Sequence, residues 1–211
     1  MAPAVAAVVL TGAGVLLTMT GLSHASPPPN PSRADAAPAV TRSLPDPSAG
    51  DSTARDLHAR TLPRSAPTRL TITSIGIDTG PLVRLGVDAH GSLDVPRRFD
   101  QAGWYTPGPW PGQYGPAVIA GHVDSTTGPG VFYRLGALHK SAVITVALAN
   151  GSVARFTVDR VVSYAKSAFP TSSVYSDTTH RAELRLITCG GRFDTRSGHY
   201  LNNIVAYAHL L

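Results

Sequence analysis

Cysteine is almost absent from this sequence, because Cys189 is the only one among 211 residues. An intramolecular disulfide is therefore excluded. A zinc site is not indicated either, since one Cys and scattered His residues do not give the spacing of metal ligands. A lone thiol is incidental, intermolecular or reactive. We expect no metal and no cofactor, and the role of Cys189 becomes the central question.

Charge is also sparse. Charged residues make up 15% of the chain, the formal net charge is +5, and no long run of Lys or Arg occurs. Proteins that bind nucleic acids usually show a clustered basic surface. We therefore expect no nucleic-acid partner, whereas a weak attraction to an anionic cell envelope agrees with the net charge.

The N-terminal stretch 4–22 lacks charge altogether and is followed by Ser23 and Ala25, small residues at the spacing that a signal peptidase recognises. A cleaved signal peptide fits that site. An uncleaved membrane anchor fits the length, because about 20 apolar residues span a bilayer. With either alternative for residues 1–25, we expect the rest of the chain to be extracytoplasmic, anchored at the cell membrane or secreted to the cell envelope.

Residues 26–67 contain few apolar side chains and are rich in Pro, Ala, Ser and Asp. Such a segment cannot bury enough surface to offset the entropy lost on ordering. The composition predicts a disordered spacer between the N-terminal stretch and a folded domain at 68–211.

Short runs of β-branched residues separated by turn signals occupy residues 68–211. Asn150-Gly151 between two alternating runs is typical of a β-hairpin. Only VFYRLGAL, residues 131–138, has the pattern of a short helix. The pattern predicts an all-β fold, an eight-stranded closed or nearly closed barrel with one or two short helices.

Two polar residues stand at the ends of predicted strands. Cys189 ends AELRLITC, and His122 follows PAVIAG and begins the loop VDSTTGPG. A thiol needs a base or an electrostatic partner to act as a nucleophile near neutral pH, so His122 is the candidate base. Asp124, two residues later, is interpreted either as a surface acid or as a residue that positions the loop or the imidazole.

The sequences PAVIAGHVDS and LRLITCGG resemble the sortases, cysteine transpeptidases that attach proteins to Gram-positive cell walls. The GWYTPGPWPGQYGPAVIAGHVD stretch and the LITCGGRFD ending are most similar to class F sortases of actinobacteria. The resemblance covers residues 68–211. The order of His before Cys differs from papain-like proteases, and the Ser-x-Gly-Cys motif of L,D-transpeptidases is absent.

The resemblance implies a mechanism and partners. Cys189 attacks the Thr–Gly carbonyl of an LPXTG-like sorting signal and forms an acyl-thioester, while His122 protonates the leaving amine and later deprotonates the incoming one. The implied partners are secreted proteins that carry this signal and a cell-wall precursor that supplies the amine.

The family also uses an Arg on the strand after the Cys strand, but HYLNNIVAYA has Leu201 and Asn202 at the expected positions. Three other arginines are candidates. Arg196 is the first choice for stabilising the oxyanion, because a loop can fold it over the thiol. Arg192 and Arg185 are expected to bind substrate, although Arg185 lies four strand residues, about 13 Å, before Cys189. Backbone N–H groups of the two glycines after Cys189 can share the oxyanion role.

A second hypothesis is a secreted β-barrel binding module in which Cys189 is incidental. The two hypotheses differ in one structural expectation. In an enzyme, the Cys189 sulfur and the His122 ring face each other across adjacent strands in a groove. A separation well beyond the reach of a hydrogen bond or one water, with the thiol sealed in apolar packing, favours the binding module.

Overall fold

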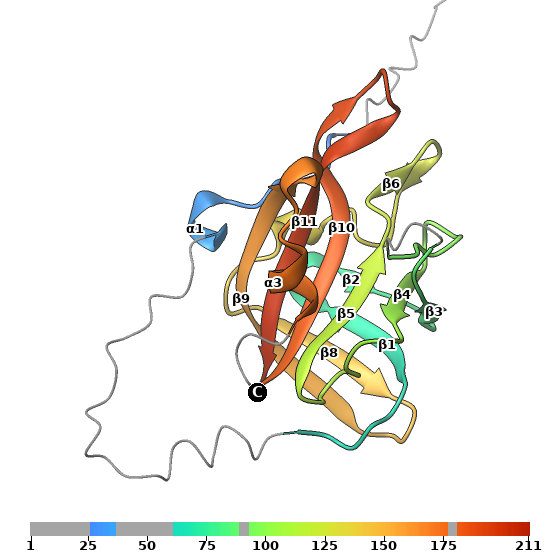
Figure 1. Ribbon diagram of the computed structural model, residues 1–211, viewed down its shortest axis with the longest axis vertical. Coiled ribbons are helices and arrows are strands. Elements are labelled where there is room, and N and C mark those ends of the chain that lie inside the picture. Colours follow the sequence, from blue (N-terminus) through green and yellow to red (C-terminus); the bar gives the residue numbers. More distant parts are fainter. Residues whose placement is uncertain (1–25, 37–60, 89–92, 177–180) are drawn as a thin grey trace, which may run out of the picture.

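The computed structural model of the chain describes residues 26–36, 61–88, 93–176 and 181–211 (Figure 1). One large sheet and one small one dominate this part of the chain. The strands are β1 (Pro67–Ile72), β2 (Ile77–Asp78), β3 (Val83–Leu85), β4 (Ala102–Tyr105), β5 (Gly115–Gly121), β6 (Asp124–Ser125), β7 (Gly128–Pro129), β8 (Val143–Leu148), β9 (Val153–Ala165), β10 (Ala182–Asp194) and β11 (His199–Leu210).

The large sheet has nine strands in the order β2-β1-β8-β9-β11-β10-β5-β4-β3, and β6 pairs with β7. Neighbouring strands are antiparallel except in the pairs β10–β5 and β3–β4. The sheet curls on itself (Figure 1). The described helices are short: α1 (Arg33–Ala36), α3 (Thr171–Tyr175) and three 3₁₀ turns at Thr73–Ile75, Leu135–Ala137 and Lys166–Ala168.

Apolar side chains pack on both faces of the sheet. The larger cluster fills the inside of the curl and includes Ile119, Phe132 and Leu186. A second cluster lies on the opposite face and includes Ala120 and Ile187. Strand β10 contributes to both, which explains why its sequence is an almost continuous apolar run rather than an alternation of apolar and polar residues.

The all-β prediction is confirmed, with nine strands in the main sheet where eight were expected. The Asn150-Gly151 turn does join β8 to β9, and Gly151 has a φ of 84°. Residues 131–138 form turns and a 3₁₀ helix rather than an α-helix. The part of the chain described here has no helix long and apolar enough to cross a membrane. The expected signal peptide or anchor at 1–25 lies outside the described residues.

The expected spacer differs from the prediction at both of its ends. Residues 26–36 lie against the barrel, where the buried Asp35 carboxylate accepts hydrogen bonds from Ser32 and from the Lys140 amide. These hydrogen bonds, the Ser32 bond first, lower the Asp35 pKa to about 2. Near the other end, Leu62 donates a backbone hydrogen bond to Gly112. Residues 37–60, between these two segments, lie outside the described residues.

Candidate functional site

Cys189 lies in the middle of β10, five residues before the strand ends at Asp194 and not at its end as the sequence predicted, and β10 is a central strand of the large sheet. On one side β10 pairs with β11, where Cys189 is opposite Asn203. On the other side it runs parallel to β5, with Ile187 opposite Ala120. The Cys189 side chain is half-buried and forms no disulfide. The thiol is therefore open to solvent in part, as a nucleophile requires.

His122 directly follows β5, two residues after Ala120. Continuing the parallel register from the Ile187–Ala120 pair brings Cys189 and His122 to the same level on neighbouring strands. Ala120 and Ile187 lie in the same apolar cluster on the outer face. Because side chains two apart in a strand share a face, this spacing directs the thiol to the outer face and places the His122 position at that same edge.

The His122 ring is held by the segment 96–99. Its Nε2 atom lies 2.7 Å from the Pro96 carbonyl oxygen, and its ring centroid lies 4.6 Å from that of Phe99. A carbonyl oxygen only accepts hydrogen bonds, so Nε2 donates and carries the proton of the neutral ring. The other nitrogen, Nδ1, is then the one free to take up and release a proton.

The His122 backbone is fixed as well. The Phe132 amide donates to its carbonyl oxygen over 2.9 Å, and the Gly130 amide donates to the Val123 carbonyl over 2.8 Å. A Cβ atom on Gly130 would lie 2.5 Å from the His122 carbonyl oxygen. Only glycine allows this close approach. The loop after β7 therefore fixes the position of the His122 backbone from which the imidazole extends.

Cys189 and His122 lie at the same level of neighbouring strands. Among the described residues, no hydrogen bond joins the thiol to the ring, because the imidazole is turned toward Pro96 and Phe99. Hydrogen bonds between catalytic groups are often long or poorly aligned before substrate binds. The arrangement agrees with a Cys/His pair that tightens around substrate, and the half-exposed thiol is not sealed in apolar packing.

The three candidate arginines lie in different surroundings. Arg185 is 2% exposed, and its Nη2 donates to Glu183 over 2.5 Å. Its guanidinium also lies 4.6 Å from the centre of the Tyr207 ring. Because Arg185 is buried and neutralised, the substrate-binding role expected for it has no support: its side chain is part of the packed outer cluster instead.

Arg192 and Arg196 lie on the projecting end of the β10–β11 hairpin (Figure 1). Both are exposed. The Arg196 amide donates to Asp194 over 3.1 Å, and this bond, with one from Ser197, lowers the Asp194 pKa. Gly191 follows the Cys189-Gly190 pair with a φ of 74°, a conformation that favours glycine, at the irregularity where the register of the hairpin shifts.

Two further residues near the site were not among the candidates predicted from the sequence. Arg97 follows Pro96, the residue that binds the His122 ring, and is exposed. Asn203 lies directly opposite Cys189 on β11. Asn203 could have been found from the sequence by pairing the two strands across the Gly-rich turn, whereas Arg97 depends on a long-range contact.

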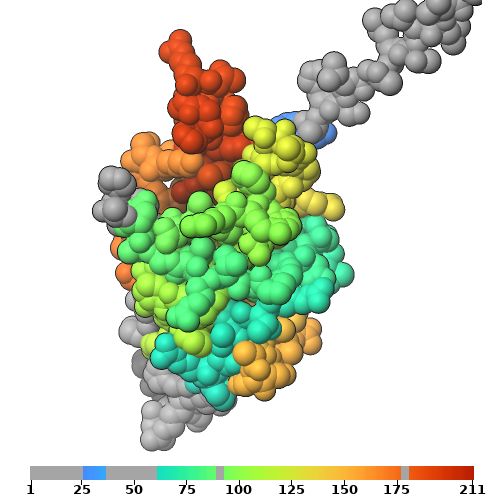
Figure 2. Space-filling view, turned by 90° about the vertical axis from the view of Figure 1, so that its right-hand side faces the viewer, coloured from blue at the N-terminus to red at the C-terminus, as the bar shows by residue number. Residues whose placement is uncertain are grey.

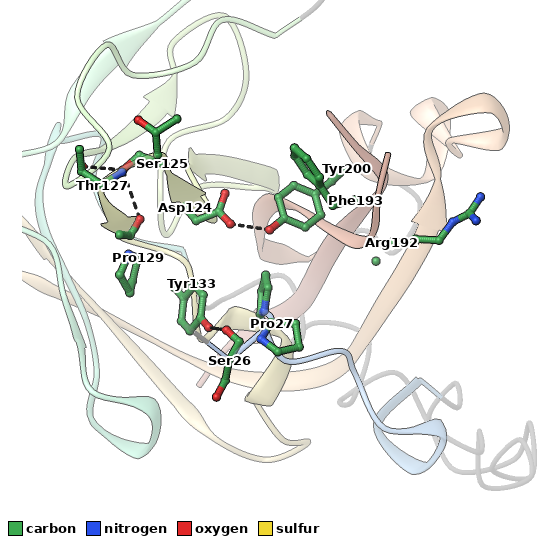
Figure 3. Close-up of a pocket in the computed structure, with 14 residues that line it drawn as sticks. Ser26, Pro27, Asp124, Ser125, Thr127, Pro129, Tyr133, Arg192, Phe193 and Tyr200 are labelled. Atoms are coloured by element: carbon green, nitrogen blue, oxygen red, sulfur yellow. Dashed lines mark hydrogen bonds between the residues drawn. The ribbon is translucent and has the colours of Figure 1, made fainter. Parts of the chain in front are cut away.

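A cavity of about 490 Å³ opens between β6–β7 and the base of the hairpin, with Gly191, two residues after Cys189, in its wall (Figure 3). The Tyr200 hydroxyl donates a hydrogen bond to Asp124 across it. Burial, followed by this hydrogen bond and by the charge of Asp124, raises the Tyr200 pKa. Asp124 thus faces Tyr200, and no hydrogen bond between its carboxylate and His122 is found in the described chain.

Helix α3 and its flanking residues cover part of the outer face next to β5 and β10 (Figure 1). Val174 is fully buried in the outer cluster, and the Tyr175 ring packs edge-on against Tyr105. Burial raises the Tyr175 pKa. The helix therefore closes the apolar part of the face and leaves the end that carries Cys189 open.

Comparison with known proteins identifies the family. Residues 70–211 match the model of the sortase domain. No curated protein matches the chain. Among solved structures, sortase A of Corynebacterium diphtheriae is 16% identical with a TM-score of 0.52, and the match covers 70% of this chain and 61% of that one.

Two further structures have the same fold. Sortase C-1 of Actinomyces oris is 20% identical with a TM-score of 0.52, covering 68% of this chain and 72% of that one. Sortase C2 of the Group B Streptococcus pilus island 1 is 15% identical with a TM-score of 0.51, covering 81% and 82%. These structures support the fold, and assignment to class F stays a prediction. Because the family model spans the whole barrel, including both the His122 and Cys189 strands, the chain belongs to the sortase family of cysteine transpeptidases.

Proposed function

We propose that the chain cleaves an LPXTG-like sorting signal and transfers the acyl part to a cell-wall amine, with Cys189 as nucleophile and His122 as general acid and base. The observation that carries this proposal is the position of the two residues at the same level of two neighbouring parallel strands inside a sortase domain. A non-catalytic binding module is not favoured, since it gives no reason for this pairing.

The first half of the reaction forms a thioester. The Cys189 sulfur attacks the carbonyl carbon of the scissile peptide bond, and the carbonyl oxygen becomes an oxyanion. His122 Nδ1, the nitrogen left free by the hydrogen bond to Pro96, takes the proton of the Cys189 thiol and delivers it to the leaving amine as the C–N bond breaks. General acid catalysis of this kind typically contributes about 10²- to 10⁴-fold.

The oxyanion needs a positive or hydrogen-bonding partner. We assign Arg196 to this role, with the Gly190 and Gly191 amides as further donors, and Arg192 to substrate binding. Both arginines are exposed on the hairpin that continues β10 beyond the thiol, so both are accessible to a bound peptide. Arg97, within the segment 96–99 that holds His122, is a further exposed cation.

The proposed partners and location follow from the same assignment. The acyl donors are secreted proteins with the sorting signal, the acceptor is a cell-wall precursor, and the enzyme works outside the cytoplasm at the cell envelope. Membrane attachment through residues 1–25 belongs to this proposal.

Replacing the nucleophile tests the proposal. Cys189→Ala is expected to abolish cleavage of a fluorogenic LPXTG-type peptide while the far-UV circular dichroism and the urea midpoint stay close to the wild-type values, because the half-buried thiol makes no hydrogen bond to another described residue. Ser173→Ala, which removes one polar atom from a half-buried residue of α3, serves as the control. Cleavage that persists in Cys189→Ala would reject Cys189 as the nucleophile.

A further inference from the structure

The cavity beside the thiol has no role in the cleavage step described above. It lies where the hairpin base meets β6–β7, and Gly191, two residues after Cys189, forms part of its wall. Figure 2 shows the hairpin standing out from the body of the protein beside residues of the β6–β7 region. A molecule in this cavity would therefore approach an acyl group on Cys189 from the hairpin side.

The chemistry of the wall is that of a cation site. Asp124 is the only carboxylate among the described residues that line the cavity. The rings of Tyr133, Phe193 and Tyr200 surround it, and the Phe193 and Tyr200 centroids are 5.1 Å apart. Figure 3 shows Arg192 directed away from the Asp124–Tyr200 pair. A carboxylate next to aromatic rings attracts a positively charged group through ion pairing and through the ring faces.

The hydrogen bonds of the residues that line the cavity leave one oxygen of Asp124 available to a cationic group. Tyr200 donates to one oxygen of Asp124, and a carboxylate accepts several hydrogen bonds. The Tyr133 hydroxyl donates to the Ser26 carbonyl, which fixes that ring at the cavity edge. The other Asp124 oxygen has no further hydrogen bond within the described chain and is free to accept from an ammonium group.

We propose that this cavity binds the amine acceptor as its ammonium ion, with the ammonium on Asp124 and a flexible aliphatic stem against the aromatic rings. This inference rests on the proposed transpeptidase function and adds the site and the class of the second substrate, a primary alkylammonium such as a lysine-type side chain. Such amines are almost fully protonated near neutral pH.

Both protons that the ammonium loses during transfer have a destination. The bound ammonium loses one proton to solvent, and the neutral amine attacks the thioester carbonyl. A second proton passes from the nitrogen through His122 to the sulfur as the C–S bond breaks. One ammonium and one thioester thus give one amide, one Cys189 thiol and one released proton. No oxidant or further reactant is needed.

The test compares a charged nucleophile with an uncharged one. The full-length chain in detergent is given a fluorogenic LPXTG-type peptide with either Nα-acetyl-lysine amide or hydroxylamine, which is uncharged at neutral pH. For Asp124→Asn, the ratio of kcat/KM for the lysine amide to kcat/KM for hydroxylamine is expected to fall about tenfold, as loss of a charged hydrogen bond predicts. Asp78→Asn, the same charge change in an exposed ion pair with Arg69, should leave the ratio unchanged.

Binding is measured separately in the Cys189→Ala chain. Nuclear magnetic resonance titration should show that Nα-acetyl-lysine amide shifts signals of the cavity residues more strongly than Nα-acetyl-norleucine amide, and that Asp124→Asn removes the difference. An equal response to the two ligands, or an unchanged ratio in the kinetic test, would overturn the ammonium site. If the wild-type chain cleaves no such peptide, the proposed function fails, and the titration alone decides about the site.

Discussion

The two ends of strand β10 carry arginines in opposite situations. Near its start, Arg185 is buried, ion-paired to Glu183 and stacked on Tyr207. Past Cys189, Arg192 and Arg196 stand exposed on a projecting hairpin. One residue type thus stabilises the sheet at one end and is available to a substrate at the other. The two roles differ because Arg185 is buried beside a carboxylate, whereas Arg192 and Arg196 are exposed. Their distances from Cys189 along the chain do not explain the difference.

Substitution of Arg185, the buried and ion-paired arginine, is expected to give the largest effect, a loss of stability. Arg185→Ala leaves the Glu183 carboxylate buried with only Arg181 beside it, and breaking a buried pair in this way costs about 3–5 kcal/mol. Urea unfolding should show this loss. A double variant, Arg185→Met with Glu183→Gln, removes both charges and should recover much of the stability. If Arg185→Ala leaves the free energy of unfolding within about 1 kcal/mol of wild type, the buried pair is not stabilising.

Substitutions of the two exposed arginines are expected to affect turnover and substrate binding rather than stability. Arg196→Ala should lower kcat by roughly 10²-fold if its guanidinium stabilises the oxyanion, and Arg192→Ala, a matched change four residues earlier, should mainly raise KM for the peptide. Both variants should unfold at the wild-type urea concentration. Equal or reversed effects on kcat would move the oxyanion role to Arg192, to Arg97 or to the backbone amides.

The smallest effect is expected on the inner side of the same strand. Thr188 is 3% exposed, and its hydroxyl has no hydrogen-bond partner in the part of the protein that the structure covers. Thr188→Val keeps the shape and removes this unsatisfied group, so the free energy of unfolding should rise by about 1 kcal/mol. Thr188→Ser, which keeps the hydroxyl, is the control. A loss of stability in Thr188→Val would indicate that the hydroxyl is bonded to water or to a residue outside the described chain.

The fold and the neighbouring positions of Cys189 and His122 could be predicted because their signals are local. Alternating and β-branched runs indicate strands, and Cys189 and His122 each end such a run. The role of Arg185 was not predictable in the same way. Strand alternation gives the face on which a side chain lies, but it does not reveal that Glu183, two residues earlier on that face, neutralises the guanidinium.

The sequence did not predict that residues 26–36 adopt a defined structure against the barrel, and the reason is related. Composition predicts a spacer, yet Asp35 is fixed by the Lys140 amide, 105 positions away in the chain. A local signal does exist: Ser32 and Asp35 form a Ser-x-x-Asp pattern, and the Asp35 amide bonds to the Ser32 hydroxyl over 3.1 Å at the start of α1. The ring hydrogen bond of His122 to Pro96 has no comparable sequence signal.

The parallel pairing of β5 with β10 also has a consequence for the order in which the protein becomes active. The strand that ends at His122 is joined to the strand of Cys189 only across a long stretch of chain, and β11 must insert between β9 and β10 to complete the sheet. Contacts of such large sequence separation form slowly and late in folding. A growing chain that still lacks β11 therefore carries the thiol with only one of the two strands that flank it. We expect transpeptidase activity only when the sheet is complete.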